Sequence, residues 1–216
     1  MSSNLFVKIC GITNLPDALC AIDAGTNALG FVFYPRSPRF CDVEKARHII
    51  RELPRSVVKV GVFVDEPIDL LLQYLSNLPL DYVQLHGSES PEFCSKLSVG
   101  VIKGLRVRNL DEIRNMPDYP VAYYLLDSYS SKEYGGTGTA FDWSIALDAK
   151  KILSSPILLS GGLTPENVAE AVKITIPYGV DVSSGVETSP GIKDHKKIKA
   201  FINNARNART ASEQGN

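Results

Sequence analysis

Residues 6–14 read FVKICGITN, and they decide the fold because they join an apolar strand directly to the start of a helix. The apolar run carries Lys8 in its middle and ends on Cys10, and Asn14 stands just before a helix-like segment. A thiol at the carboxyl end of a parallel strand occupies the position where α/β proteins place their chemistry. We therefore predict that Cys10 is a catalytic residue.

The pairing of an apolar strand with a helix-sized segment recurs eight times along the chain. Strands are predicted at 6–9, 28–33, 57–64, 82–85, 101–105, 122–126, 156–159 and 180–182. Helices are predicted at 15–24, 43–53, 68–75, 91–97, 110–115, 143–153 and 195–204, with a further one that opens at Thr164 as its N-cap. Strands that are apolar on both faces and joined by crossover helices form a parallel sheet, and eight such units close into a (β/α)8 TIM barrel of the α/β class. A doubly wound open sheet is the rival architecture, and the count of eight units disfavours it.

Length and composition indicate a single domain that handles a small molecule. Residues 1–205 are predicted to form one barrel domain, and the polar residues 206–216 are predicted to be a disordered tail. The net charge of −1 offers no field that would attract nucleic acid. No stretch approaches the roughly 20 apolar residues of a membrane span, and the amino terminus lacks the features of a signal peptide, so a cytoplasmic location is expected. The four cysteines lack the spacing of a zinc site or of a disulfide framework.

Active sites of such barrels lie at the carboxyl ends of the strands, which narrows the search to the polar residues there. These positions hold Cys10, Arg36, Arg39, Asp65, His86, Arg106, Asp127, residues 160–162 and residues 183–185. Glycines at the ends of the seventh and eighth strands let backbone N–H groups approach an anion, and this pair of loops is the usual phosphate site of the fold. Tight turns without a ligand are the alternative reading of these glycines.

Two of these residues are candidates for acid–base chemistry. Lys8 shares a strand face with Cys10, so its ammonium group would favour the thiolate. Asp181 lies on the last strand, and we hypothesise that it pairs with Lys8 inside the barrel. Asp127 begins the longest loop and could serve as a general acid. The alternatives are a packing role for Cys10 and a turn-forming role for Asp127.

The remaining polar candidates give weaker signals. The guanidinium fork of Arg36 or Arg39 suits a carboxylate or a phosphate, although solvated surface charge is the commoner case. His86 could titrate near neutrality or be a structural histidine. Residues 135–138 carry three glycines, which indicates a loop that can fold over a ligand.

A series of short motifs resembles one known family. The motifs are KICGIT at 8–13, GFVFYP at 30–35, QLHG at 84–87, LD at 126–127, YGGTG at 134–138, LSGGL at 159–163, PENV at 165–168 and DVSSGVE at 181–187. Together, and in this order, they resemble the phosphoribosylanthranilate isomerases of tryptophan biosynthesis. The resemblance runs from the first strand to the last helix, and only the tail beyond Arg206 lies outside it.

The resemblance implies an Amadori rearrangement, in which N-(5-phosphoribosyl)anthranilate becomes 1-(2-carboxyphenylamino)-1-deoxyribulose 5-phosphate. It implies that Cys10 is the general base, that Asp127 is the general acid and that Arg39 binds the substrate carboxylate. The phosphate-binding residues that it implies are Gly161, Gly162, Ser183, Ser184 and Gly185. No metal and no organic cofactor is implied. The expected partner is the small phosphoribosyl substrate, and the expected assembly is a monomer or a homodimer.

Two other functions stay open at this point. Indole-glycerol-phosphate synthase is a neighbouring phosphate-binding barrel, but it needs a ring-closure site based on Lys and Glu and usually has a longer amino-terminal extension. A non-catalytic phosphosugar-binding protein is the second alternative, and the presence of both Cys10 and Asp127 argues against it.

Overall fold

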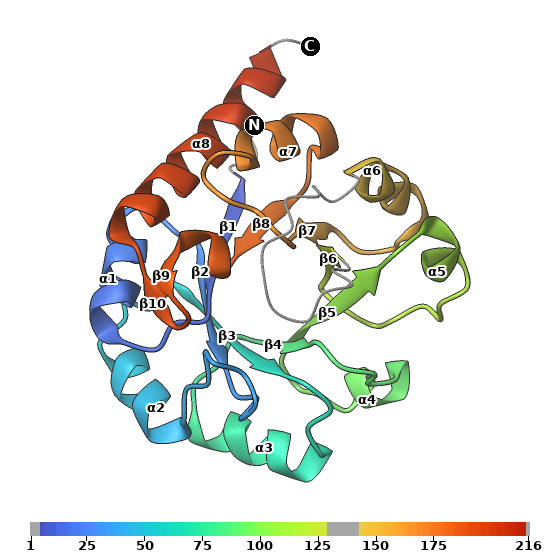
Figure 1. Cartoon of the computed structure of the whole chain (residues 1–216). Helices are drawn as coiled ribbons and strands as arrows, with labels where there is room; N and C mark the ends of the chain where they lie inside the picture. The colour runs from blue at the N-terminus through green and yellow to red at the C-terminus, as the bar shows by residue number, and fades with distance from the viewer. Residues whose placement is uncertain (1–4, 129–142, 215–216) are drawn as a thin grey trace.

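The computed structural model describes residues 5–128 and 143–214, and these form a closed barrel of parallel strands surrounded by helices (Figure 1). The strands, in barrel order, are β1 (Phe6–Cys10), β2 (Ala28–Val32), β3 (Val58–Phe63), β4 (Tyr82–Leu85), β5 (Gly100–Val107), β6 (Tyr123–Ser128), β7 (Ile157–Leu159) and β8 (Gly179–Val182). Strand β1 pairs with both β2 and β8, so the sheet closes on itself. The predicted (β/α)8 barrel is confirmed, and the rival open sheet is wrong.

Each strand is followed, directly or after a loop, by a helix on the outside of the barrel (Figure 1). The helices are α1 (Leu15–Asp23), α2 (Val43–Arg51), α3 (Ile68–Asn77), α4 (Pro91–Ser95), α5 (Leu110–Arg114), α6 (Trp143–Ile152), α7 (Val168–Thr175) and α8 (His195–Gln214). Their starts follow local sequence signals: Asn14, Asp42 and Asn109 each accept a hydrogen bond from the N–H three residues later, at 2.9, 2.9 and 3.1 Å. Within the described ranges, no helix combines the length and the apolar character of a membrane span.

Alternation along the strands separates two apolar regions. Outward-facing residues such as Val7 and Ile9 are buried against the helices in the larger core. Inward-facing residues pack the interior of the barrel in a layer that comprises Ala28, Val60, Ile102, Leu125 and Leu158. Because this layer fills the interior, the polar side chains gather above it, at the carboxyl ends of the strands.

The last helix is longer than predicted. Helix α8 continues to Gln214, so the prediction of a disordered tail is wrong for residues 206–214. The apolar face of the helix continues through Ala205 and Ala208, which are both buried. The side chain of Arg206 also donates to a backbone carbonyl just after α1. Small apolar residues and the long side chains of Arg206 and Arg209, which donates to the carbonyl of Pro177 at 3.4 Å, therefore hold a segment that looks polar in composition.

Two smaller differences follow β7 and β8. Helix α7 begins at Val168 rather than near Thr164, because Thr164 caps a separate turn in which its Oγ1 accepts from the N–H of Glu166 at 3.2 Å. After β8 the chain forms three short elements, which are η1 (Ser184–Val186), β9 (Glu187–Ser189) and β10 (Ile192–Lys193). Strands β9 and β10 make an antiparallel hairpin, and its strands are too short to show a period in the sequence.

A buried ion pair crosses the seam where the barrel closes. Lys8 of β1 and Asp181 of β8 are register partners, and the Nζ atom lies 2.8 Å from Oδ1. Their side chains are 0% and 6% exposed. Burial acts to lower the pKa of Lys8, but Asp181 and Cys10 together raise it, so Lys8 stays an ammonium. The hypothesis of this pair, made from the strand faces, is confirmed.

We expect the two charges to be strongly coupled in the free energy of unfolding. Lys8→Met or Asp181→Leu alone leaves a buried charge unpaired and should cost about 3–5 kcal/mol, whereas the double substitution should cost much less than the sum. Urea unfolding of the four proteins measures this coupling. The more exposed pair Lys59–Asp81, at 2.9 Å, is the control, with an expected coupling of about 0.2–1 kcal/mol. Equal coupling at the two pairs would contradict the prediction.

Candidate active site

Cys10 ends β1 inside the mouth of the barrel. The residue is 7% exposed and packs beside Val32 and Val62, which lie at the ends of the next two strands. Its register partner on β2 is Gly30, where a Cβ would lie 2.8 Å from the thiol sulfur. The thiol therefore occupies a space that the neighbouring strand leaves open by lacking a side chain.

The surroundings of Cys10 oppose its ionisation. Burial raises the pKa of the thiol, and the carboxylate of Asp181 adds to the rise. Lys8 and Lys193 lower this pKa, as ammonium groups should, but they do not offset the burial. Lys8 therefore lowers the pKa of Cys10, as we expected from the sequence. The pKa of Cys10 is nevertheless raised overall, because burial outweighs this effect. Each of the two lysines also faces a carboxylate, which reduces its influence on the sulfur.

Asp127, near the end of β6, lies against His86. The Nε2 atom of His86 is 3.3 Å from Oδ2 of Asp127, and its Nδ1 atom is 3.1 Å from Nε2 of Gln84. His86 follows β4, so its ring must pass over β5 to reach β6. Gly104 of β5 permits this, because a Cβ there would lie 2.5 Å from Nδ1 of His86. Gln84 was not a predicted site residue, although its place two positions before His86 puts both on one strand face.

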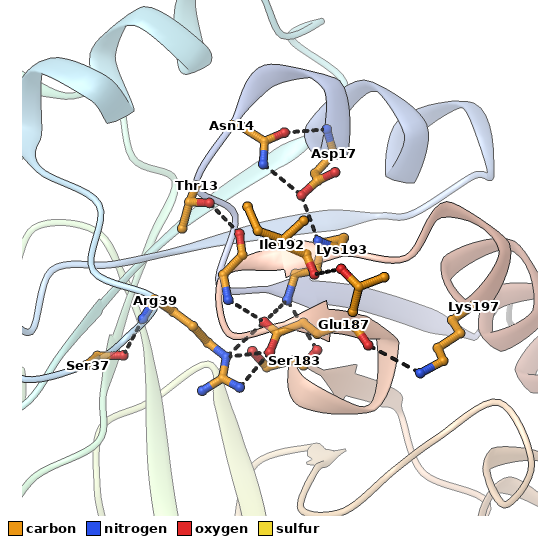
Figure 2. A network of polar contacts seen from close by, with 12 residues as sticks. Thr13, Asn14, Asp17, Ser37, Arg39, Ser183, Glu187, Ile192, Lys193 and Lys197 are labelled. Carbon is orange, nitrogen blue, oxygen red and sulfur yellow. Dashed lines mark hydrogen bonds and ion pairs between the residues drawn. The ribbon is translucent and has the colours of Figure 1, made fainter.

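Arg39 lies on the loop after β2, and a carboxylate holds its guanidinium group (Figure 2). Its Nε atom is 2.9 Å from Oε1 of Glu187, and its Nη2 atom is 2.6 Å from Oε2. Glu187 also binds Lys193, whose Nζ atom is 2.8 Å from Oε1. Neither Glu187 nor Lys193 was a predicted site residue. The one sequence signal was the place of Glu187 in the motif at 181–187.

The loops after β7 and β8 touch each other. A Cβ on Gly185 would overlap a carbonyl oxygen of the loop after β7, so only glycine fits there. Gly161 and Gly162 have φ values of 80° and 67°, which favour glycine. The Oγ atom of Ser183 is buried and has no hydrogen-bond partner among the described residues. With Ser184, which begins η1, these loops can offer backbone groups and a hydroxyl group to an anion.

Three further predicted candidates are Asp65, Arg106 and Arg36, and of these Arg106 is the register partner of Asp127. Asp65 accepts hydrogen bonds from the N–H and the Oγ of Ser88, at 2.6 and 2.8 Å, and so holds a turn. Arg106 lines a cavity of about 230 Å³ between β5 and α5, and Arg36 is exposed. The glycine-rich stretch 135–138 lies outside the described residues. Within the described part of the chain, no three His, Cys, Asp or Glu side chains gather as ligands for a metal ion.

Comparison with known proteins decides the family. The family model described as N-(5'phosphoribosyl)anthranilate (PRA) isomerase matches residues 7–204. The chain belongs to this family. The isomerase of Geotalea uraniireducens (strain Rf4) is 52% identical over 200 residues, which cover 93% of this chain and 98% of that protein. The isomerase of Pelobacter propionicus is 50% identical over 206 residues, which cover 95% of this chain and 98% of that protein.

Solved structures of phosphoribosylanthranilate isomerases share the barrel. The structure from Thermotoga maritima has a TM-score of 0.84 and 47% identity, and the match covers 94% of this chain and 99% of that one. A further isomerase structure contains reduced 1-(o-carboxyphenylamino)-1-deoxyribulose 5-phosphate, and it matches with a TM-score of 0.80 and 43% identity over 94% of this chain and 99% of that one. The two alternatives considered from the sequence were an indole-glycerol-phosphate synthase and a non-catalytic phosphosugar-binding protein. Neither is supported, because the matched proteins are phosphoribosylanthranilate isomerases and the matches cover nearly the whole chain.

We expect the gap at Gly104 to be needed for turnover by the isomerase. Gly104→Ala should push the ring of His86 away from Asp127 and lower kcat by about 10–100-fold, since small misplacements in an active site have effects of this size. Gly100→Ala is the matched control, because its Cβ would also meet an aromatic ring, that of Tyr82, but at the opposite end of β5. Steady-state kinetics and thermal unfolding of both variants make the comparison. Equal losses of kcat in the two variants would show that the effect is only one of stability.

Proposed function

We propose that this chain converts N-(5-phosphoribosyl)anthranilate to 1-(2-carboxyphenylamino)-1-deoxyribulose 5-phosphate as a step of tryptophan biosynthesis. Membership of the phosphoribosylanthranilate isomerase family over residues 7–204 carries the proposal. The barrel mouth supports it, because a buried thiol at the end of β1 and a carboxyl group near the end of β6 both come from strand ends on the same rim. The substrate is a small phosphoribosyl compound, and its rearrangement consists of proton transfers.

Asp127 acts as the general acid of the first step in this proposal. Its proton passes to the furanose ring oxygen, and the bond between that oxygen and C1 breaks. The lone pair of the anthranilate nitrogen then forms an iminium bond to C1. The contact of 3.3 Å between His86 and Oδ2 supports this role, because it limits where the carboxyl group can point.

Cys10 acts as the general base of the second step. The iminium group makes the proton on C2 acidic, and the thiolate removes it. The electrons of the C–H bond form an enolamine while the nitrogen becomes neutral. The enolamine becomes the ketone when C1 gains a proton and the C2 hydroxyl group loses one. The number of protons on the enzyme is then the same as at the start.

Charged and backbone groups at the rim bind the two ends of the substrate. Arg39 binds the carboxylate of the anthranilate ring, because a guanidinium fork matches a carboxylate in geometry. The phosphate is bound by the loops after β7 and β8, through Gly161, Gly162, Ser183, Ser184 and Gly185. The unpartnered Oγ atom of Ser183 and the close contact of these loops support this assignment.

We also infer that the chain acts in the cytoplasm as a monomer or a homodimer. One matched structure is of monomers of the dimeric isomerase from Thermotoga maritima, with a TM-score of 0.81 and 43% identity over 94% of this chain and 99% of that one. The four cysteines of this chain are free thiols, which suits a reducing compartment. Size-exclusion chromatography with light scattering measures the assembly.

Removing either proton-transfer group should abolish most of the activity. We expect Cys10→Ala and Asp127→Asn each to lower kcat by about 10²–10⁴-fold, the usual contribution of general acid–base catalysis. The loss of phosphoribosylanthranilate fluorescence measures the rate. Cys94→Ala, which removes a buried thiol of α4, is the control and should keep normal turnover. Unaltered turnover in the Cys10 variant would refute its role as the base.

The pH dependence of kcat/KM should reflect the raised pKa of the buried Cys10 thiol. Because burial raises the pKa of Cys10, the thiolate forms only at higher pH, and kcat/KM should keep rising through the ordinary thiol range near about 8.5. Rate measurements between about pH 6 and pH 10 test this. Cys41→Ala is the control, since burial also raises the pKa of the Cys41 thiol, to about 11. This variant should keep the rising limb of the kcat/KM profile. A limb centred well below the ordinary thiol value would contradict the prediction.

A further inference from the structure

A carboxylate of the β9–β10 hairpin fixes the direction of the Arg39 guanidinium group. Glu187 accepts hydrogen bonds from Nε at 2.9 and 3.1 Å and from Nη2 at 2.6 Å (Figure 2). A guanidinium group has five N–H donors in a planar fork, and this contact takes the edge formed by Nε and Nη2. It leaves Nη1 and one hydrogen of Nη2 on the other edge, whose spacing matches a second carboxylate.

Glu187 is a buried group rather than a surface counter-ion. Its side chain is 5% exposed, and its second partner is Lys193, which is 0% exposed. Burial opposes the charge on Glu187, yet Arg39 and Lys193 hold the pKa of this carboxyl group below its ordinary range. One carboxylate thus faces two cations. Because Lys193 already compensates the carboxylate, Arg39 keeps a positive charge for a ligand.

Lys193 joins this cluster to the phosphate loop. Its Nζ atom donates to the carbonyl oxygen of Ser183 at 3.2 Å, and its backbone N–H donates to Oδ2 of Asp17 at 2.8 Å. Lys193 and Glu187 are register partners in the hairpin, so their positions depend on each other. The hydroxyl group of Thr13 also donates to a carbonyl of the hairpin turn. The hairpin therefore connects the loops that follow β1 and β8 with the arginine of the loop after β2 (Figure 2).

Gly11 provides the surface on which Arg39 lies. A Cβ on Gly11 would be 2.8 Å from Cδ of Arg39 and 2.9 Å from Oγ of Ser183. Gly11 follows Cys10 directly, and its φ of 74° favours glycine. The missing side chain of Gly11 thus leaves room for both the stem of Arg39 and the hydroxyl group of Ser183.

We propose that Glu187 is a positioning residue that makes the enzyme specific for an aromatic amine carrying a carboxylate. It turns the open edge of Arg39 toward that carboxylate and, through Lys193, holds this edge at a fixed distance from the phosphate loop. The proposal rests on the proposed function in one respect, which is that Arg39 binds the substrate carboxylate. Without Glu187, Arg39 keeps its charge but rotates more freely, and the ligand must then order it during binding.

Two stable probes separate this role from a general structural one. They are reduced 1-(2-carboxyphenylamino)-1-deoxyribulose 5-phosphate and the same compound without the ring carboxylate. In titration calorimetry, the unmodified chain should bind the carboxylated probe about 100-fold more tightly, and Arg39→Met should abolish this preference. Glu187→Gln should reduce the preference about tenfold and change the binding of the other probe little.

Matched variants control for the loss of a buried charge. Glu89→Gln removes the carboxylate of the buried pair Lys103–Glu89, at 2.7 Å, and should leave the preference unchanged. Glu187→Asp keeps the charge but shortens the side chain by one methylene group, so it should also lose part of the preference. This second variant serves if the glutamine variant does not fold. The preference is a ratio of two Kd values from one sample, so a reduced folded fraction does not alter it.

The possible outcomes distinguish the inference from the function on which it rests. Full preference in the Glu187 variants overturns the positioning role and leaves Arg39 as the carboxylate site. Equal binding of the two probes by the unmodified chain overturns the positioning role together with the assignment of Arg39. The isomerase assay is independent of both results, and only absence of turnover there overturns the proposed function.

Discussion

Lys8 and Asp181 meet inside the barrel at the seam between its first and last strands, where both charges are almost completely buried. Burying one of these charges alone would be strongly unfavourable, so the pair requires that β1 and β8 lie in one register. That register fixes the heights at which Cys10 and Ser183 emerge, because each lies two residues beyond a member of the pair. The same two charges act on the thiol with opposite signs, so the seam sets both the geometry and the electrostatics of the proposed base.

Missing side chains shape the site as much as present ones do. Gly30 leaves room for the sulfur of Cys10, and Gly104 leaves room for the ring of His86 to cross a strand. Each glycine lies on the strand next to the residue for which it leaves room. A large side chain on one strand is thus accommodated by a missing side chain on its neighbour. His86 and Asp127 belong to strands that are separated by β5, and they can meet because Gly104 leaves space on that strand.

Periodicity and strand parity made much of this structure predictable. The eight units, Cys10 at a strand end and the pairing of Lys8 with Asp181 all follow from which residues share a face. The roles of Glu187 and Lys193 did not follow, because their hairpin is a short insertion whose contacts depend on the loops around it. The end of α8 was also missed, since Ala205 and Ala208 carry little apolar signal until a neighbouring surface covers them. The net effect on the thiol of Cys10 depends on burial, which becomes measurable only once the barrel is assembled.

The seam also sets an order of events during synthesis. The partners Lys8 and Asp181 are 173 residues apart in the chain, and α8, the last helix, packs against α1, the first (Figure 1). While the ribosome is still making the intervening units, Lys8 has no carboxylate partner across the seam and the first strand has one unpaired edge. Contacts of such long range form late in folding, and domains are completed only when their last elements emerge. Closure of this barrel therefore belongs to the end of translation, and until then the edge of β1 is open to wrong partners.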